Sequence, residues 1–159
     1  MTRRPFIRRA RPDEAAALSE VARAAKRHWG YPPEWMLEWR EALTITPAVI
    51  AERPVYVAEA ADDVPVAAVD GFYALLLDAP TAVLEHLWVR PPSIGRGVGR
   101  ALLDHARERA SAGGASELRI DSDPHAEGFC LRMGARRVGE IRADVGDTAR
   151  QLPRLVLTL

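Results

Sequence analysis

The chain has few of the features that mark specialised classes of protein. It contains one cysteine, Cys130, and one lysine, Lys26, and its 22 basic side chains balance 22 acidic ones. A single cysteine excludes a disulfide framework within the chain. The zero net charge removes the simplest electrostatic basis for binding nucleic acid or an anionic membrane surface. We therefore expect neither of these partners.

Long apolar runs are also missing. The longest, at 72–77, is ended by Asp78 and falls far short of the ~18 residues that indicate a membrane span. Pro12, Asp13 and Glu14 follow the N-terminal arginines at the place where a signal peptide would have its apolar segment. These absences predict a cytoplasmic protein.

The remaining composition is that of one folded domain, which we expect to span residues 1–159. A chain of 159 residues with 48% hydrophobic content can form a hydrophobic core without structural metals or oligomerisation. Apolar periodicity and turn residues predict alternating strands and helices. The strands are expected at 6–10, 55–59, 64–77, 81–89, 117–121, 136–142 and 152–159, and the helices at 12–26, 33–43, 99–112 and 126–133. Between residues 43 and 55, prolines at 47 and 54 are expected to break up regular structure.

The most informative segment is the glycine-rich loop at 94–100, which joins a predicted strand to a predicted helix. Its alternating glycines allow successive N–H groups to point into one concavity at a helix N-terminus, which is a site for phosphate. A nucleotide-triphosphate loop would need Lys followed by Ser or Thr where Arg100 and Ala101 stand. A dinucleotide loop fits poorly because an antiparallel meander precedes the glycines. A glycine-rich turn without a ligand is the remaining alternative.

Two motifs together carry a family resemblance. The first combines Val89-Arg90-Pro91 at a strand end with Arg96-Gly97-Val98-Gly99 at a helix start. It resembles the acyl-CoA-binding motif of the GNAT superfamily of N-acetyltransferases. The second motif contains Asp123, Phe129-Cys130 and Met133-Gly134 and is similar to another motif of that family. The resemblance implies an α/β (α+β) fold with a mixed, mostly antiparallel sheet of six to seven strands, flanked by about four helices and splayed between strands four and five.

The resemblance also implies a binding site for acetyl-CoA. Backbone groups at 87–89 would contact the pantetheine arm and the thioester oxygen, and the loop at 94–100 would hold the pyrophosphate. Ile94 replaces the Gln or Arg usual in the family, but this position contributes mainly a backbone N–H. The implied acetyl-CoA residues are Leu87, Trp88, Val89, Ile94, Gly95, Arg96, Gly97, Val98, Gly99, Arg100, Asp123 and Phe129.

Acetyl transfer requires a neutral amine, and Glu85 is our candidate for the general base. A lysine-like amine with a pKa of ~10.4 must give up a proton at pH 7, at a cost of about 4.6 kcal/mol. Strand alternation places Glu85 on the face of Leu87 and Val89, where several family members draw a base, and places His86 on the opposite face. Two alternatives stay open. The carboxylate can be solvated or paired with an arginine, and a strand bulge would reverse the choice between Glu85 and His86.

Cys130 stands where the family has a tyrosine that is often proposed to protonate the departing thiolate. A thiol is no weaker an acid than a phenol, but its side chain is shorter. We therefore expect first a small buried helix residue and second a general acid. A covalent acyl-cysteine comes third, because the local sequence supplies no activating partner.

The acceptor side is expected between the first two helices, where aromatic residues could form a wall for the body of an amine. Trp35 and Trp39, however, also have the spacing of residues in a helical core. The loop at 143–150 is a further candidate. The candidate acceptor residues are Trp29, Tyr31, Trp35 and Tyr73.

The leading hypothesis is an N-acetyltransferase that moves the acetyl group of acetyl-CoA to a primary amine of a small molecule or peptide, by direct attack in a ternary complex. The alternative is a non-catalytic acyl-CoA-binding domain of the same fold. No metal is expected in either case. A predicted exposed edge strand near the C-terminus also makes a homodimer an expectation.

Overall fold

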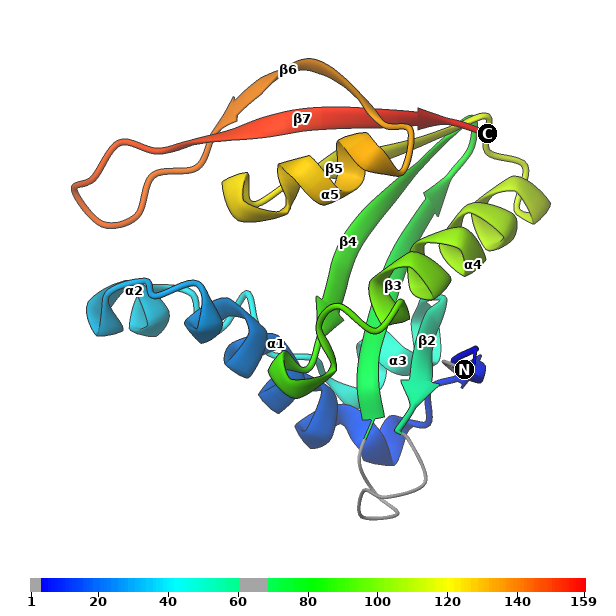
Figure 1. Cartoon of the computed structure of the whole chain (residues 1–159), viewed down its shortest axis with the longest axis horizontal. Helices are drawn as coiled ribbons and strands as arrows, with labels where there is room; N and C mark the ends of the chain where they lie inside the picture. Colours follow the sequence, from blue (N-terminus) through cyan, green and yellow to red (C-terminus); the bar gives the residue numbers. More distant parts are fainter. Residues whose placement is uncertain (1–3, 61–68) are drawn as a thin grey trace.

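One mixed sheet of seven strands organises the chain, in the order β1-β2-β3-β4-β5-β7-β6 (Figure 1). The computed structural model describes residues 4–60 and 69–159. The strands are β1 (Ile7–Arg9), β2 (Val55–Glu59), β3 (Val69–Asp78), β4 (Thr81–Val89), β5 (Glu117–Asp121), β6 (Arg136–Arg142) and β7 (Gln151–Thr158). Only β4 and β5 pair in parallel among the strands of the described residues. The predicted mixed, mostly antiparallel sheet is confirmed, with β6 at its edge.

Helices cover both faces of this sheet. They are α1 (Ala15–His28), α2 (Pro33–Glu38), α3 (Pro47–Glu52), α4 (Val98–Ala112) and α5 (Glu127–Arg132). The described residues thus hold five α-helices where about four were expected. No helix in the described ranges is both long enough and apolar enough to cross a bilayer.

The additional helix, α3, begins at a proline that was expected to break regular structure. Pro47 occupies the first helical turn, where its missing N–H costs nothing, and the Thr46 side chain accepts a hydrogen bond of 3.2 Å from the N–H of Val49. Two other bounds also differ from expectation. The helix predicted at 33–43 ends at Glu38, and the one predicted from Pro12 has a 3₁₀ turn before α1 begins. The start of the strand predicted at 64–77 lies outside the described residues.

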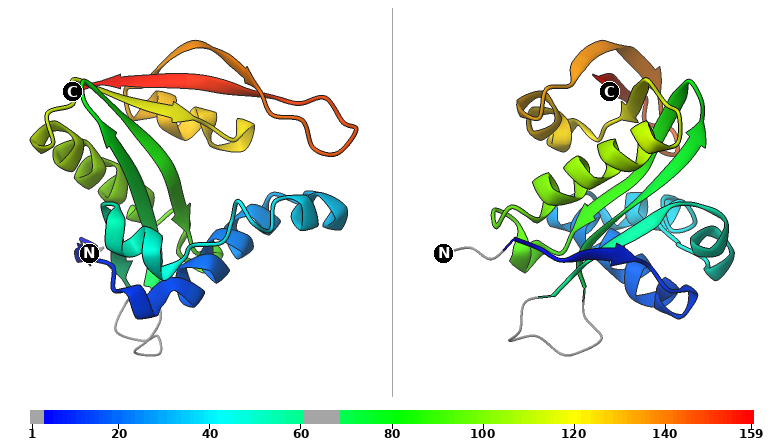
Figure 2. Two further views of the ribbon diagram at one scale, coloured as in Figure 1. Left: turned by 180° about the vertical axis from the view of Figure 1, so that it is seen from behind. Right: turned by 90° about the vertical axis from the view of Figure 1, so that its right-hand side faces the viewer.

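Two apolar cores lie on opposite faces of the central strands, and Figure 2 shows α4 on one side of the sheet and α1 and α3 on the other. Along β3, Tyr73 and Leu75 belong to the core that contains the apolar residues of α4 and the Cys130 side chain of α5. Phe72 and Ala74 belong to the core that contains residues of α1 and α3. The alternation of side chains along one strand therefore holds both helical layers on the sheet.

The predicted splay lies between β4 and β5. Parallel pairing joins only 81–83 of β4 to 117–119 of β5. Beyond these residues the two strands diverge (Figure 1). Leu84 and residues 86–89 therefore pair with β3 on one side and with no strand of the described residues on the other. Their backbone polar groups on that side are open to a ligand.

A bulge interrupts β4 at Glu85. His86 pairs with Ala74 and Leu84 pairs with Leu75, so Glu85 has no partner in the register. After the bulge, Leu87 lies on the same face of the sheet as Leu84. The strict alternation expected for residues 83 to 89 is therefore wrong, because pairing with β3 inserts one extra residue into β4.

Candidate functional site

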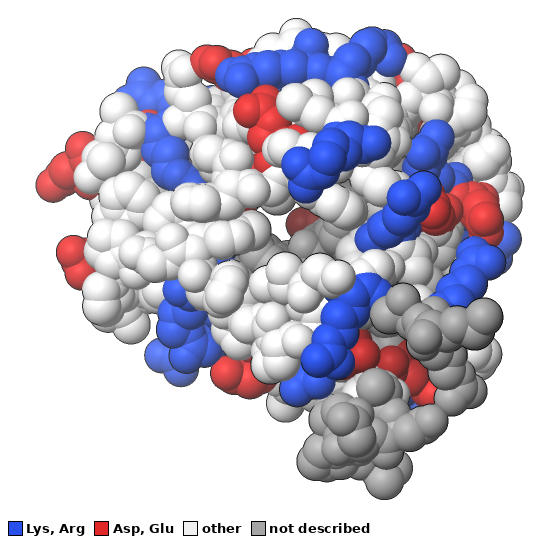
Figure 3. All heavy atoms as spheres, viewed as in Figure 1, with Lys and Arg blue, Asp and Glu red and all other residues white. Residues whose placement is uncertain are grey.

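A cavity of about 450 Å³ opens where β4 and β5 splay apart. Figure 3 shows the surface hollowed at this level, between the part built from β5, β6, β7 and α5 and the rest of the molecule. The cavity is bounded by 84–89 of β4, by 120–123 at the end of β5, by the glycine loop and by α5. Segments that are distant in sequence thus converge on one elongated site.

The glycine loop bends into the cavity because two of its glycines have a left-handed backbone. The φ angles are +82° at Gly95 and +84° at Gly97, and Gly97 is the N-cap residue of α4. The first turn of α4 therefore presents the N–H groups that a helix start leaves unpaired. Arg100 also lines the cavity. The backbone geometry and the positive charge at this end of the cavity suit an anion.

The residues predicted to bind acetyl-CoA line this cavity, with two exceptions. Val98, the first residue of α4, is buried in the apolar core, and Arg96 is exposed and does not line the cavity. Ile94 lines the cavity although half of its surface is exposed. The remaining lining residues of the predicted set are Leu87, Trp88, Val89, Gly95, Gly97, Gly99, Arg100, Asp123 and Phe129.

Glu85 and His86 both line the cavity, and each is already engaged by another side chain. The carboxylate of Glu85 forms an ion pair with the guanidinium of Arg53, directly after α3. The indole N–H of Trp88 donates to Nδ1 of His86 at 3.0 Å, and burial lowers the pKa of His86. A neutral His86 that accepts at Nδ1 carries its hydrogen on Nε2. Both observations favour the alternatives of an arginine-paired carboxylate and a hydrogen-bonded histidine.

Cys130 reaches the cavity from α5 but is 3% exposed. Burial raises the pKa of its thiol. The group is therefore a protonated thiol near neutral pH, which agrees with the first expectation of a small buried helix residue.

The predicted acceptor residues occupy two different places. Trp29 lines the cavity. Tyr31 stacks on Trp35 with ring centroids 5.7 Å apart and meets Trp39 edge-on at 4.8 Å, beside the cavity. Tyr73 instead lies fully buried beneath α4, with its hydroxyl 2.6 Å from Nδ1 of His105. The structure thus separates Tyr73 from the other three.

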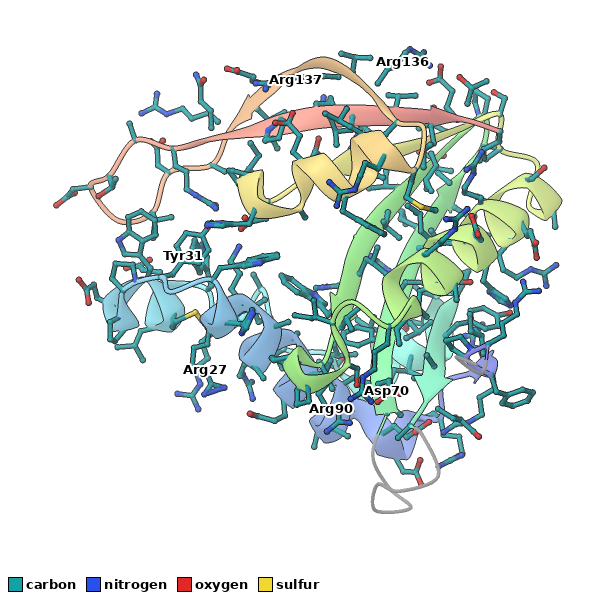
Figure 4. The ribbon with its side chains drawn as sticks, viewed as in Figure 1. Arg27, Tyr31, Asp70, Arg90, Arg136 and Arg137 are labelled. Atoms are coloured by element: carbon teal, nitrogen blue, oxygen red, sulfur yellow. The ribbon has the colours of Figure 1, made fainter. Side chains whose placement is uncertain are left out.

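A network of charges centred on Asp123 closes the side of the cavity next to Tyr31. Lys26 Nζ donates to Oδ2 of Asp123 at 2.7 Å, and Arg150 Nη2 donates to the same oxygen at 3.0 Å. The Tyr31 hydroxyl lies 2.9 Å from Oδ2 of Asp123 and accepts from Arg150 at 2.7 Å. We call Lys26, Tyr31, Asp123, His125 and Arg150 the Asp123 cluster. Figure 4 shows Tyr31 between α2 and the connection from β6 to β7.

The Asp123 cluster keeps its carboxylate ionised. Burial by itself would raise the pKa of Asp123, but the hydrogen bonds from Lys26 and from the backbone N–H of His125 outweigh it and lower the pKa to about 2. Burial lowers the pKa of Lys26, against the opposing effect of Asp123. Lys26 lies over Trp39, with 4.1 Å from Nζ to the ring centroid. The cluster is thus compact, charged and enclosed by aromatic rings.

Sequence reasoning missed Lys26 and His125 as parts of the site. Lys26 has only its rarity to distinguish it, and its partner Asp123 lies 97 residues away. His125 lies inside the second motif, two residues after Asp123, and this spacing is the one local signal. Arg150 is the last residue of the candidate loop 143–150.

Comparisons with known proteins place this geometry in a family and a fold. The model of the acetyltransferase (GNAT) family matches residues 16–135. A GCN5-related N-acetyltransferase from Rhodopseudomonas palustris is similar in structure, with a TM-score of 0.80 and 21% identity over 100% of this chain and 98% of that one. No curated protein sequence matches the chain.

Two further solved structures share the fold. The PaiA N-acetyltransferase from Thermoplasma acidophilum, solved in complex with coenzyme A, has a TM-score of 0.71 and 21% identity over 97% of this chain and 98% of that one. The ribosomal-protein-S18-alanine N-acetyltransferase from Escherichia coli has a TM-score of 0.70 and 15% identity, covering 97% of this chain and 93% of that one.

Proposed function

Because the chain belongs to the acetyltransferase (GNAT) family, whose acyl donor is acetyl-CoA, we propose that it transfers the acetyl group to a primary amine of a small molecule or peptide. The observation that carries the proposal is the cavity between the splayed strands. It joins an anion site at the start of α4 to an unpaired stretch of β4 backbone. An anionic, amide-containing donor needs both features.

The donor is expected to lie along the cavity with its pyrophosphate at the glycine loop. A Cβ added at Gly95 or Gly97 would meet nothing within 4 Å, so space surrounds the backbone there. Arg100 adds a charge to the N–H groups of the first turn. The pantetheine arm, which carries amides, would extend along residues 86–89, whose backbone groups would bind it as a neighbouring strand would.

The acceptor is expected to approach from the side of Trp29. A direct attack in a ternary complex needs a group that takes a proton from the amine. Glu85 stays our sequence-based candidate, although Arg53 engages its carboxylate. Cys130 is the sequence-based candidate for protonating the departing sulfur, although burial raises the pKa of its thiol and a purely structural role was expected first. Both side chains line the cavity, so variants of each can test these roles.

The experiment combines calorimetry for acetyl-CoA binding with a thiol-release assay over a panel of amines. We expect binding and an amine-dependent release of free thiol. Arg100→Gln should raise the KM for acetyl-CoA about tenfold, since it removes a charge-assisted contact. The control is Arg109→Gln, which changes an exposed arginine in the last turn of the same helix.

Glu85→Gln tests the base. A loss of ~10²-fold or more in kcat is expected if Glu85 takes the proton, and no loss removes it from that role. The exposed Glu52 of α3 supplies the control Glu52→Gln. Binding of acetyl-CoA without thiol release for any amine would support the non-catalytic alternative and overturn the proposed activity.

A further inference from the structure

His125 presents an imidazole at the cavity wall in a fixed orientation. It lies in the 3₁₀ turn Pro124–Ala126, which begins three residues after the last residue of β5. Its ring stacks on Trp29, with centroids 5.3 Å apart and planes inclined by 10°. Its side chain is 47% exposed, and both His125 and Trp29 line the cavity. The ring is thus held by stacking while one of its edges stays accessible.

Asp123 determines which nitrogen of this ring carries the hydrogen. Nδ1 of His125 lies 3.0 Å from Oδ1 of Asp123 and 3.1 Å from the Tyr31 hydroxyl. An ionised carboxylate can only accept hydrogen bonds, so Nδ1 must be the donor. The Tyr31 hydroxyl can accept from Nδ1 while it donates to Asp123, so all of these contacts are satisfied together. In neutral His125 the free lone pair is therefore on Nε2.

Resting on the proposed acetyl transfer, we propose that His125, in place of the sequence-based candidate Glu85, is the general base that takes the proton from the acceptor amine at Nε2, with Asp123 as the positioning residue. The arrangement supplies what a base needs, namely a lone pair at the cavity wall, a fixed ring plane and a buried carboxylate that stabilises the imidazolium after proton transfer. Only 6% of the Asp123 side chain is exposed, so water screens this stabilisation weakly.

Glu85 and His86 also lie on the cavity wall near His125, but both are less free to accept a proton. The carboxylate of Glu85 is held by Arg53. The Nδ1 atom of His86 accepts from the Trp88 indole, so its remaining ring nitrogen bears a hydrogen. Among these three candidates, His125 alone combines exposure to the cavity with a carboxylate that sets its tautomer.

The charged and titratable groups around His125 come from three segments. Asp123 precedes it in the chain, Lys26 and Tyr31 belong to α1 and the turn that follows, and Arg150 comes from the β6–β7 connection. Lys26 and Arg150 both donate to Oδ2 of Asp123, whereas His125 faces Oδ1. The two cations therefore leave one oxygen of the carboxylate for the imidazole.

The proton and bond balance of the step is simple. The acceptor ammonium passes one proton to Nε2, and the imidazolium later releases it to solvent. The neutral nitrogen attacks the thioester carbonyl, a C–N bond forms and the C–S bond breaks with its electron pair on sulfur. The second nitrogen proton leaves as the amide forms and ends on the departing sulfur. The products are the acetylated amine, the free thiol and one proton.

The kinetic experiment compares His125→Ala, His125→Gln and the matched control His28→Gln, which changes an exposed histidine of α1. We expect His125→Ala and His125→Gln to lower kcat ~10²-fold or more at pH 7, with less than a threefold change in acetyl-CoA affinity. Added imidazole should raise the rate of His125→Ala at least tenfold and leave the rate of His28→Gln unchanged. Rates of both His125 variants within threefold of the unaltered enzyme would overturn the proposal.

A second measurement does not depend on turnover. Nitrogen-15 NMR of the four histidines, assigned through single substitutions, reports the tautomer of each ring. We expect the Nδ1–H tautomer for His125, and its loss in Asp123→Asn. An Nε2–H tautomer in the unaltered protein would exclude His125 as the base, whatever the activity. An unaltered protein that releases no thiol with any amine would instead refute the proposed function, whereas an active His125→Ala variant would refute only this inference.

Discussion

Nζ of Lys26 lies 2.7 Å from Oδ2 of Asp123, although 97 residues separate the two in sequence. The contact ties the last turns of α1 to the end of β5 at the splay. Arg150, in the β6–β7 connection, donates a hydrogen bond to the same oxygen. Three segments that surround the candidate acceptor side are therefore held by one carboxylate, so its ionisation bears on the shape of the site.

The first prediction is a loss of stability in acid that depends on Asp123. Its pKa is lowered to about 2 in the folded chain, against ~3.9 for an ordinary aspartate. Above pH ~3.9 Asp123 is ionised in both the folded and the unfolded chain, and its stabilisation of the folded chain is complete. As the pH falls from about 4 towards 2, Asp123 becomes protonated in the unfolded chain while it stays ionised in the folded chain. The free energy of unfolding therefore falls by about 2 kcal/mol.

Denaturant unfolding between pH 2 and pH 7 measures this, with Asp123→Asn as the comparison. The variant should lack the Asp123 part of the acid loss and should be about 3 kcal/mol less stable at pH 7, since Lys26 and Arg150 lose the carboxylate that they share. Burial lowers the pKa of Lys26, which shows that burying its ammonium group costs free energy. The Lys26–Asp123 ion pair therefore stabilises the folded chain near neutral pH by less than the lowered pKa of Asp123 alone would indicate. Parallel acid profiles for the two proteins would contradict the prediction.

The second prediction separates backbone strain from ligand binding in α4. Gly97 and Gly114 lie at opposite ends of this helix with φ angles of +84° and +89°, where an L side chain costs ~1–2 kcal/mol. Alanine at either position should lower stability by a similar amount. Gly97→Ala should also lower the affinity for acetyl-CoA, measured by calorimetry, about tenfold, because the strain moves the N–H groups of the loop. Equal affinities for the two variants would show that the loop does not hold the donor.

The third prediction concerns the two tyrosines proposed for the acceptor side. Tyr73→Phe removes the hydrogen bond to His105 beneath α4 and should cost about 1 kcal/mol of stability, with the amine KM unchanged. Tyr31→Phe removes contacts to Asp123 and Arg150 and should raise the amine KM severalfold. Thermal unfolding and steady-state kinetics check both. A raised amine KM in the Tyr73 variant alone would reverse the assignment.

Local sequence signals predicted several of the strands in the sheet well. The strands at 55–59, 81–89, 117–121 and 136–142 are confirmed, since alternation and turn residues act over a few positions. The glycine loop was recognisable for the same reason. Pro47 was misinterpreted because a proline both ends helices and begins them, and the capping contact of Thr46 depends on tertiary placement.

The rest of the site depends on pairings between distant segments. The bulge at Glu85 arises from the register of β4 against β3, which no pattern within β4 reveals. The Asp123 cluster needs the close approach of α1, the end of β5 and the β6–β7 connection. His125 belongs to a recognised motif, but its tautomer follows only from its distance to Asp123. Site features that depend on contacts between distant segments are therefore apparent only from the folded structure.

The last prediction concerns Cys130, the position at which the chain departs from its family's tyrosine. Burial raises the pKa of this thiol above its ordinary value, so proton transfer from Cys130 to a departing thiolate with an ordinary pKa of ~8.5 runs uphill. Cys130→Ala should therefore keep kcat within about threefold, and iodoacetamide should label the native protein far more slowly than the unfolded chain. A hundredfold loss of kcat with unchanged acetyl-CoA affinity would instead establish Cys130 as the proton donor, because a purely structural residue would not affect the chemical step alone.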